Sequence, residues 1–139
     1  MMTHAYDKSY VNDFMCTFAE SVDYAANDCK ISIDDFLLWF INSGIAQQIE
    51  YGNPKFLAGM SGIEMAREVI SRTMDKFDFV ERNFHSNRTV EYWSGWVFSY
   101  YQWYRNIGFE QLYRRGLTLS FICSRYIFHE ADISKAVEV

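Results

Sequence analysis

The feature that most restricts the fold is a dense block of aromatic residues in the second half of the chain. Eight of the thirteen residues from 92 to 104 are aromatic: Tyr92, Trp93, Trp96, Phe98, Tyr100, Tyr101, Trp103 and Tyr104. Aromatic residues favour strands, but these rings recur at helical intervals, and the segment 89–106 is long for a strand. The spacing therefore predicts a helix. Gly95 inside it costs roughly 1 kcal/mol relative to alanine, which the close approach of a neighbouring helix would offset.

Helical periodicity also covers most of the remaining chain. In the segment 8–25, for example, apolar residues recur every three or four positions and form one stripe. The expected helices are 8–25, 32–44, 45–51, 62–72, 89–106, 109–115, 117–127 and 130–137. The segment 117–121 alternates as a strand would, but no second alternating segment offers it a partner, so a helix is favoured. The prediction is an all-α, single-domain compact bundle of about six to eight short helices over residues 1–139.

Several boundaries between these helices carry recognisable signals. Gly52-Asn53-Pro54 predicts a left-handed cap followed by a break, and Ser61 with Glu64 matches a capping box. Ser32 is a suitable N-cap for the second helix. The polar segment 73–88 is expected to be a connection with a short helical turn at 75–80, and it is the place where a hinge would lie.

Charge and composition exclude some classes of partner. The chain has a net charge of −5, so its overall field does not attract a phosphate backbone, and no nucleic-acid partner is expected. The longest strongly apolar run, 36–41, is far shorter than the ~20 residues that span a bilayer, and no apolar signal segment opens the chain. Three widely spaced cysteines without a CxxC pair fit a reducing compartment. These observations predict a cytoplasmic protein without a membrane partner.

The residues that could carry chemistry are better explained as structural. His85 is isolated, and the group from His129 to Asp132 lacks the i, i+4 histidine pair of a zinc helix, so no metal site is expected. Cys123 could act as a nucleophile with His129 as its base and Arg125 lowering its pKa, but its apolar neighbours favour a core role. The run 58–62 lacks the spacing and the lysine of a phosphate loop. No cofactor is expected.

The aromatic block is followed near the end of the chain by the segment His129-Glu130-Ala131-Asp132-Ile133. Together with the YWSGW and YYQWY stretches of the block, this segment resembles a group of short bacterial proteins for which no activity is known, some of them encoded in mobile or accessory regions. The resemblance covers about the second half of the chain. It implies an accessory regulatory or interaction role and supplies no catalytic residue.

The function that follows from these observations is a non-enzymatic one. A helix with aromatics on nearly every face cannot bury all of them in a domain of 139 residues, and exposed Tyr, Trp and Arg are enriched at interface hot spots. The expected interaction patch consists of Trp93, Trp96, Trp103, Arg114 and Arg115. It would bind a protein partner, as a regulator, antitoxin-like inhibitor or subunit, or it would mediate self-association into a homo-oligomer.

The alternative is a small-molecule-binding domain or small enzyme. In that case the aromatic helix lines a pocket, and Cys123, His129 or Glu130 supply its polar groups.

Overall fold

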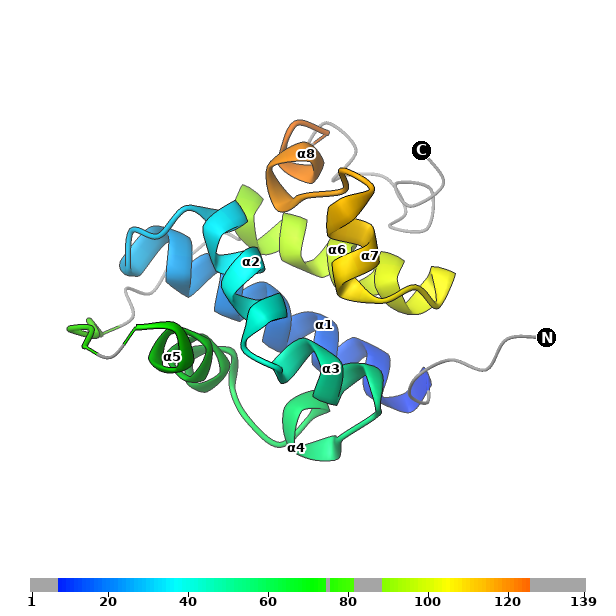
Figure 1. Ribbon diagram of the computed structural model, residues 1–139, viewed down its shortest axis with the longest axis horizontal. Coiled ribbons are helices and arrows are strands. Elements are labelled where there is room, and N and C mark those ends of the chain that lie inside the picture. Colours follow the sequence, from blue (N-terminus) through cyan, green and yellow to red (C-terminus); the bar gives the residue numbers. More distant parts are fainter. Residues whose placement is uncertain (1–7, 75, 82–88, 126–139) are drawn as a thin grey trace.

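The computed structural model describes residues 8–74, 76–81 and 89–125, and every regular element in them is a helix (Figure 1). The elements are α1 (Lys8–Asp23), the π-helix η1 (Tyr24–Asp28), α2 (Ile33–Asn42), α3 (Ile45–Glu50), α4 (Pro54–Leu57), α5 (Gly62–Thr73), α6 (Val90–Arg105), α7 (Phe109–Arg114) and α8 (Leu119–Cys123). The expectation of an all-α fold is confirmed. The helix expected at 130–137 lies outside the described residues, as do His85, His129 and Glu130.

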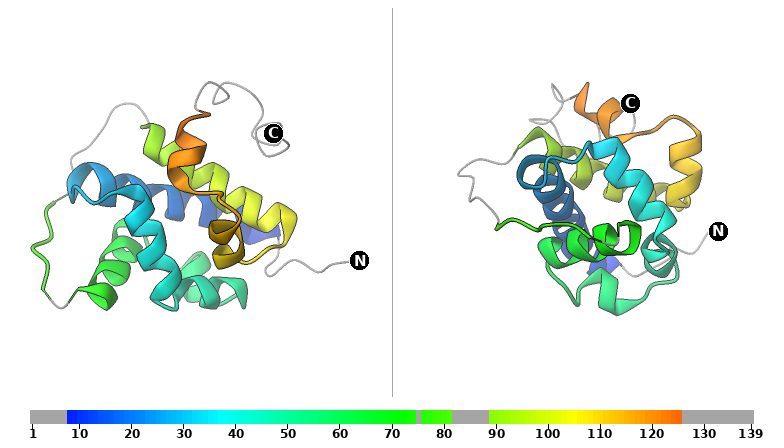
Figure 2. Two further views of the ribbon diagram at one scale, coloured as in Figure 1. Left: turned by 45° about the horizontal axis from the view of Figure 1, so that its top comes forward. Right: turned by 60° about the vertical axis from the view of Figure 1, so that its left-hand side comes forward.

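The two longest helices, α1 and α6, form the centre of the molecule. They lie side by side, with α5 packed on α1 and α8 packed on α6 (Figures 1 and 2). The two helices lie close together at Gly95, where a Cβ atom would lie 2.9 Å from the Cα atom of Ala19 and 3.1 Å from Val22. Glycine therefore lets the two backbones come together, which is the compensation expected for its low helix propensity.

A cluster of phenylalanine rings fills the space between α1, α2, α6 and α7. The ring of Phe18 lies 4.9 Å from that of Phe40 and 6.1 Å from that of Phe98, while Phe109 lies 5.2 Å from Phe40. These side chains are fully buried. Because Phe98 is the aromatic residue of α6 that enters this cluster, it fixes which face of α6 points inward.

The first turn of α6 is anchored to the end of α1 by polar contacts. The Thr89 hydroxyl accepts a hydrogen bond from the backbone N–H of Tyr92 and donates one to the carboxylate of Asp23, which is only 3 % exposed. Asn27 bridges the carboxylates of Asp23 and Glu91, donating to both. The buried carboxylate is thus satisfied, and the rotation and height of α6 relative to α1 are held at this end.

The expected helix boundaries are largely found. Ser61 and Glu64 form the complete capping box of α5, and Gly52 has a φ of 79°. Pro54, expected to be part of a break, instead begins the short helix α4, since proline is well suited to a first helical position. Ser32 occupies the N-cap of α2 without a side-chain hydrogen bond.

The structure also tests the helices that the sequence predicted at 117–127 and 75–80. The ambiguous segment near 117–121 contains the start of α8, whose N-cap Thr118 accepts from the N–H of Phe121, so the helical interpretation is confirmed. The helical turn expected at 75–80 is wrong for the part that is described, 76–80. Tyr24 donates from its hydroxyl to the Val80 carbonyl, and Arg67 lies over the ring of Phe79, so tertiary contacts hold this segment outside a helix.

Candidate functional site

The helix α6 has two chemically different faces. Its inner face carries Phe98, and positions 94, 95 and 102 beside it are also buried. At about 100° per residue, the three tryptophans lie roughly 140° to 160° around the helix axis from Phe98. We call the side directed away from the phenylalanine cluster the aromatic face; it consists of Tyr92, Trp93, Trp96, Tyr100, Trp103 and Tyr104. Five of these side chains are half-buried, and Tyr104 is 44 % exposed.

The rings of the aromatic face support one another along the helix. Tyr92 meets Trp96 edge-on at 6.1 Å, and Tyr100 stacks on Tyr104 at 5.8 Å. Tyr100 also lies 6.3 Å from Trp103. Such contacts limit the rotamers of these large side chains in the free protein. Binding a partner through this face would therefore cost little additional side-chain entropy.

A groove runs between this face and α1. It has a volume of about 450 Å³ and is lined by Lys8, Val11, Asn12, Met15, Tyr100, Trp103 and Tyr104. The residues from α1 are spaced i, i+3, i+4 and i+7, and those from α6 are spaced i, i+3 and i+4, so each helix contributes one continuous face. The buried side chains of Val11 and Met15 form the floor. We call this feature the α1–α6 groove.

One basic side chain lines the α1–α6 groove, the exposed Lys8. The Arg105 guanidinium is not part of the lining and lies 5.8 Å from the ring centre of Tyr104 and 5.7 Å from that of Tyr101. Among the described residues that line the groove, none is acidic. The sequence pattern placed these residues on one helix but did not predict that Lys8, Asn12 and Met15 line a groove.

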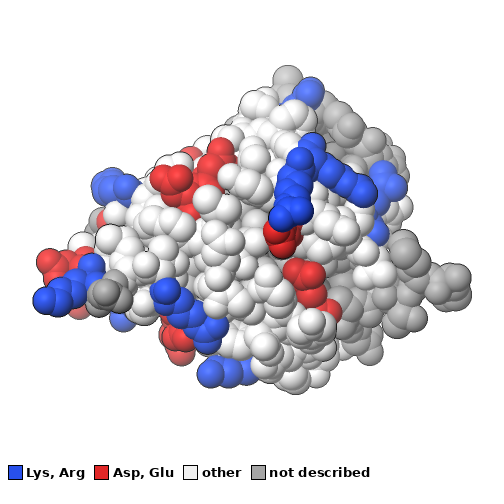
Figure 3. All heavy atoms as spheres, viewed as in Figure 1, with Lys and Arg blue, Asp and Glu red and all other residues white. Residues whose placement is uncertain are grey.

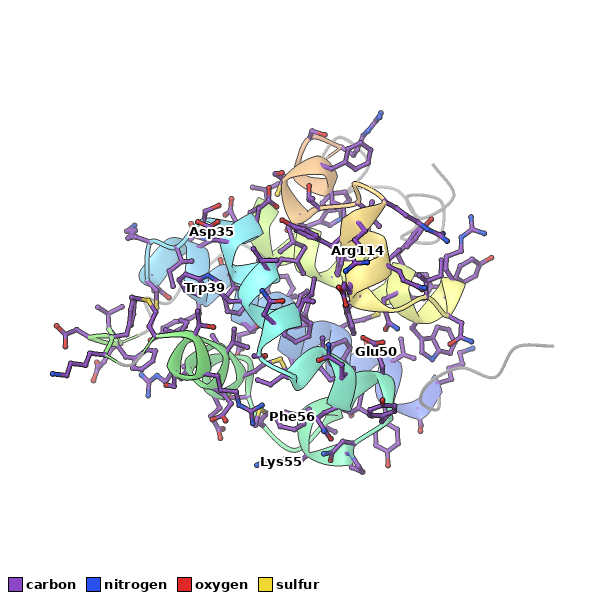
Figure 4. The ribbon with its side chains drawn as sticks, viewed as in Figure 1. Asp35, Trp39, Glu50, Lys55, Phe56 and Arg114 are labelled. Carbon is purple, nitrogen blue, oxygen red and sulfur yellow. The ribbon has the colours of Figure 1, made fainter. Side chains whose placement is uncertain are left out.

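The arginines of the expected patch lie on a different helix from its tryptophans. Arg114 and Arg115 are exposed at the end of α7, and Arg114 pairs with Glu110 at 2.7 Å on the same helix. Figure 4 shows Arg114 on α7, and Figure 3 shows basic side chains gathered over that helix. Because Phe109 and Leu112 bury the opposite side of α7 in the core, the arginines point outward from α7, whereas the tryptophans are half-buried on α6.

The described residues around Cys123 are not those that activate a nucleophile. Burial raises the pKa of its thiol, an effect that a hydrogen bond with Ser94 opposes and that the charges of Glu91 and Asp34 increase. The guanidinium of Arg125, expected to lower this pKa, lies over the ring of Phe121. A thiol with a raised pKa is protonated at neutral pH and reacts slowly.

Two acidic side chains accept hydrogen bonds at the starts of α5 and α8. The sequence pattern did not predict this role for Glu20. The Glu20 carboxylate accepts from the N–H of Gly62 at the start of α5. Asp34, in the first turn of α2, accepts from the N–H and the hydroxyl of Ser120 in α8. Within the described ranges, no three histidine, cysteine or acidic residues are grouped so that they could hold a metal ion.

The chain was compared with protein-family models, with curated proteins and with solved structures. None of the three comparisons found a match. None of the helices in the described part of the chain is long and apolar enough to cross a membrane.

Glu50 is the residue from which we expect a pH dependence of the stability. Its carboxylate accepts from the N–H of Phe109 at the start of α7, and Figure 4 shows it beside that helix. Burial raises its pKa; the bond from Phe109 opposes the shift, and the charge of Glu110 adds to it. The folded protein therefore binds this proton more tightly than the unfolded chain, so the contribution of Glu50 to stability rises as the pH falls through the raised pKa towards the unfolded value.

We expect Glu50→Gln to remove this contribution, because the amide oxygen can still accept from Phe109 but the side chain no longer titrates. At pH 7 the variant should be at least as stable as the wild type. Between pH 7 and about pH 4.3, the value for an unfolded glutamate, the wild type should gain stability relative to the variant. Urea unfolding of both proteins across this range measures the difference, and two parallel curves would contradict the prediction.

Proposed function

We propose that this protein is a non-enzymatic interaction module that binds a protein partner through the aromatic face of α6, as a regulatory protein or a subunit. The observation that carries the proposal is the division of α6 into a buried side and an aromatic face whose rings are half-buried or exposed. Tyr and Trp are the residue types most enriched at the centres of protein interfaces, because they combine a large contact area with few rotatable bonds.

The groove beside the aromatic face supports the same function. An open furrow between two helices, with an apolar floor and aromatic walls, is the shape that receives an amphipathic segment of another protein. Arg114 and Arg115 form a separate exposed position on α7. Their part in the interaction is tested by Arg115→Glu, which should weaken binding if the contact extends that far.

The prediction that tests the proposal concerns Trp96, near the centre of the aromatic face. A hot-spot residue costs about 2 kcal/mol or more when truncated, which is about 30-fold in affinity. We expect the tagged wild-type chain to retain a partner in affinity purification, or to form a homo-oligomer in light scattering. Trp96→Ala and Tyr104→Ala should both lose that association while keeping helical circular dichroism and cooperative melting.

Tyr51→Ala is the matched control, because Tyr51 is an aromatic side chain at the end of α3 with an exposed fraction of 82 %. It should retain the partner. A chain that stays monomeric and retains nothing would count heavily against the proposed function, as would a partner that binds the wild type and the Trp96→Ala variant equally well.

A further inference from the structure

The surface formed by α2, α7 and α8 carries opposite charges at its two sides. Asp34 and Asp35 lie in the first turn of α2, and Arg114 and Arg115 lie at the end of α7. Figure 3 shows acidic side chains over the start of α2 and basic side chains over α7 on one face of the molecule, with uncharged surface between them; Figure 4 labels Asp35 and Arg114 on these helices. We call this surface the α2–α7–α8 face; it consists of Asp34, Asp35, Leu38, Arg114, Arg115 and Phe121.

Exposed apolar side chains lie next to the acidic pair. Leu38 is 36 % exposed and follows Asp34 by one turn of α2. Phe121 is 45 % exposed and directly follows the serine of α8 that donates two hydrogen bonds to Asp34. In the core beneath, the ring of Phe40 meets that of Phe109, which holds α7 beside α2. The face therefore combines exposed apolar surface with charged groups, as protein interfaces do.

The charges at the two sides are not neutralised within the chain. Among the described residues, neither Asp35 nor Arg115 has an ion-pair partner. Asp34 accepts only from the N–H and the hydroxyl of Ser120, which are neutral donors. Arg114 pairs with Glu110, so on α7 the unbalanced charge is that of Arg115. One side of the face is thus negative and the other positive.

This arrangement is self-complementary. A two-fold symmetric interface brings the same surface of two copies together, and the axis lies in the plane of the contact. When that axis runs midway between Asp35 and Arg115 and perpendicular to the line that joins them, Asp35 of each copy faces Arg115 of the other. Two contacts between opposite charges form at once, and the apolar surface between them is buried.

From these observations we infer that the α2–α7–α8 face is a two-fold symmetric interface between two copies of this chain. Leu38 and Phe121 provide apolar contacts, while Asp35 and Arg115 fix the orientation of the copies. The inference goes beyond the proposed function. Because the aromatic face of α6 is directed away from the phenylalanine cluster that α2 and α7 cover, a dimer of this kind leaves the aromatic face free to bind a different protein.

The test is the particle mass of the full chain in light scattering over a series of protein concentrations. We expect the wild type to form a dimer. Asp35→Arg and Arg115→Asp each place like charges at both contacts, so each should weaken dimerisation about 10-fold or more. Higher salt should weaken the wild-type dimer, because the charges at its edge are accessible to ions.

A mixture of the two variants tests the pairing itself. In a heterodimer of Asp35→Arg with Arg115→Asp, both contacts again join an acidic and a basic side chain. We expect the mixture to dimerise about as strongly as the wild type, and a chain with both substitutions to form a homodimer. Damage to the fold by either substitution would not be reversed by mixing, so recovery reports on the contact between the copies.

Asp13→Arg is the matched control. It makes the same charge reversal as Asp35→Arg at an exposed position of α1, outside the α2–α7–α8 face. The variant should dimerise as the wild type does. Melting curves of all variants show whether each is folded.

The inference is overturned by a monomeric wild type, by a dimer that neither charge reversal weakens, or by single variants that stay monomeric when mixed. A dimer that is lost in Trp96→Ala and kept in Arg115→Asp would place self-association on the aromatic face, against this inference and in favour of the proposed function. A monomer that retains another protein through the aromatic face would leave only the proposed function standing.

Discussion

Replacing Phe18 with alanine should destabilise the protein by about 4 kcal/mol, because large-to-small changes of buried aromatic residues lose both transfer free energy and packing. Phe18 is completely buried, and its ring contacts those of Phe14, Phe40, Phe98 and Phe109. Domains of this size are commonly stable by only about 5–15 kcal/mol, so the loss would be a large fraction of the total. Urea unfolding followed by circular dichroism measures it as a shift of the midpoint.

Phe121→Ala is the control for this prediction. Phe121 is the same residue type on α8, but its side chain is 45 % exposed. Its removal should cost much less than that of Phe18. Equal losses for the two variants would mean that the phenylalanine cluster between α1, α2, α6 and α7 is not the core of the folded protein.

Gly95→Val is expected to destabilise the protein by about 3 kcal/mol, through overpacking at the contact between α1 and α6. A Cβ atom at position 95 would lie 2.9 Å from the backbone of Ala19, and a backbone atom cannot move aside as a flexible side chain can. The two helices would have to separate. Gly95→Ala should fall between wild type and Gly95→Val, since the gain in helix propensity partly offsets the same contact.

The control is a valine placed elsewhere on the same pair of helices. Asp13 is exposed on α1, and Asp13→Val exchanges two residues of similar helix propensity, so its effect should stay within about 0.5 kcal/mol. A Gly95→Val variant as stable as the wild type would show that α1 and α6 do not approach each other as closely as the structure has it. Because α1 and α6 form the groove together, a destabilising Gly95→Val change should also impair partner binding.

Part of the candidate site could be predicted from the sequence. Three of the six residues of the aromatic face, Trp93, Trp96 and Trp103, belong to the patch that the sequence predicted. The remaining three are tyrosines of the same block, and nothing in the local pattern separates them from Tyr101. The contribution of α1 to the groove was not predicted. The apolar residues Val11 and Met15 have a spacing that is equally typical of a helix face fully covered by other helices.

The position of the two arginines relative to the aromatic face could not be predicted from the sequence. Arg114 and Arg115 follow the aromatic block closely in the sequence, which favoured one continuous patch. The break between α6 and α7 was predicted, and Asn106 and Gly108 lie in it. What was not predicted is the direction in which α7 leaves α6, which puts the exposed arginines and the half-buried tryptophans at different positions. A change of chain direction of this kind depends on backbone conformation at two or three residues, which residue spacing does not encode.

The sequence by itself determined that this chain is helical, that one helix spans the aromatic block over about 89–106, and that Ser61 and Glu64 begin another. These features depend on residues within one or two turns of each other, so local spacing contains them. Only the tertiary structure decided which side of α6 is buried, that Gly95 meets Ala19, and that Lys8 shares a groove with Tyr104. These contacts join residues far apart in the sequence, and they arise because the phenylalanine rings of four helices have to share one core.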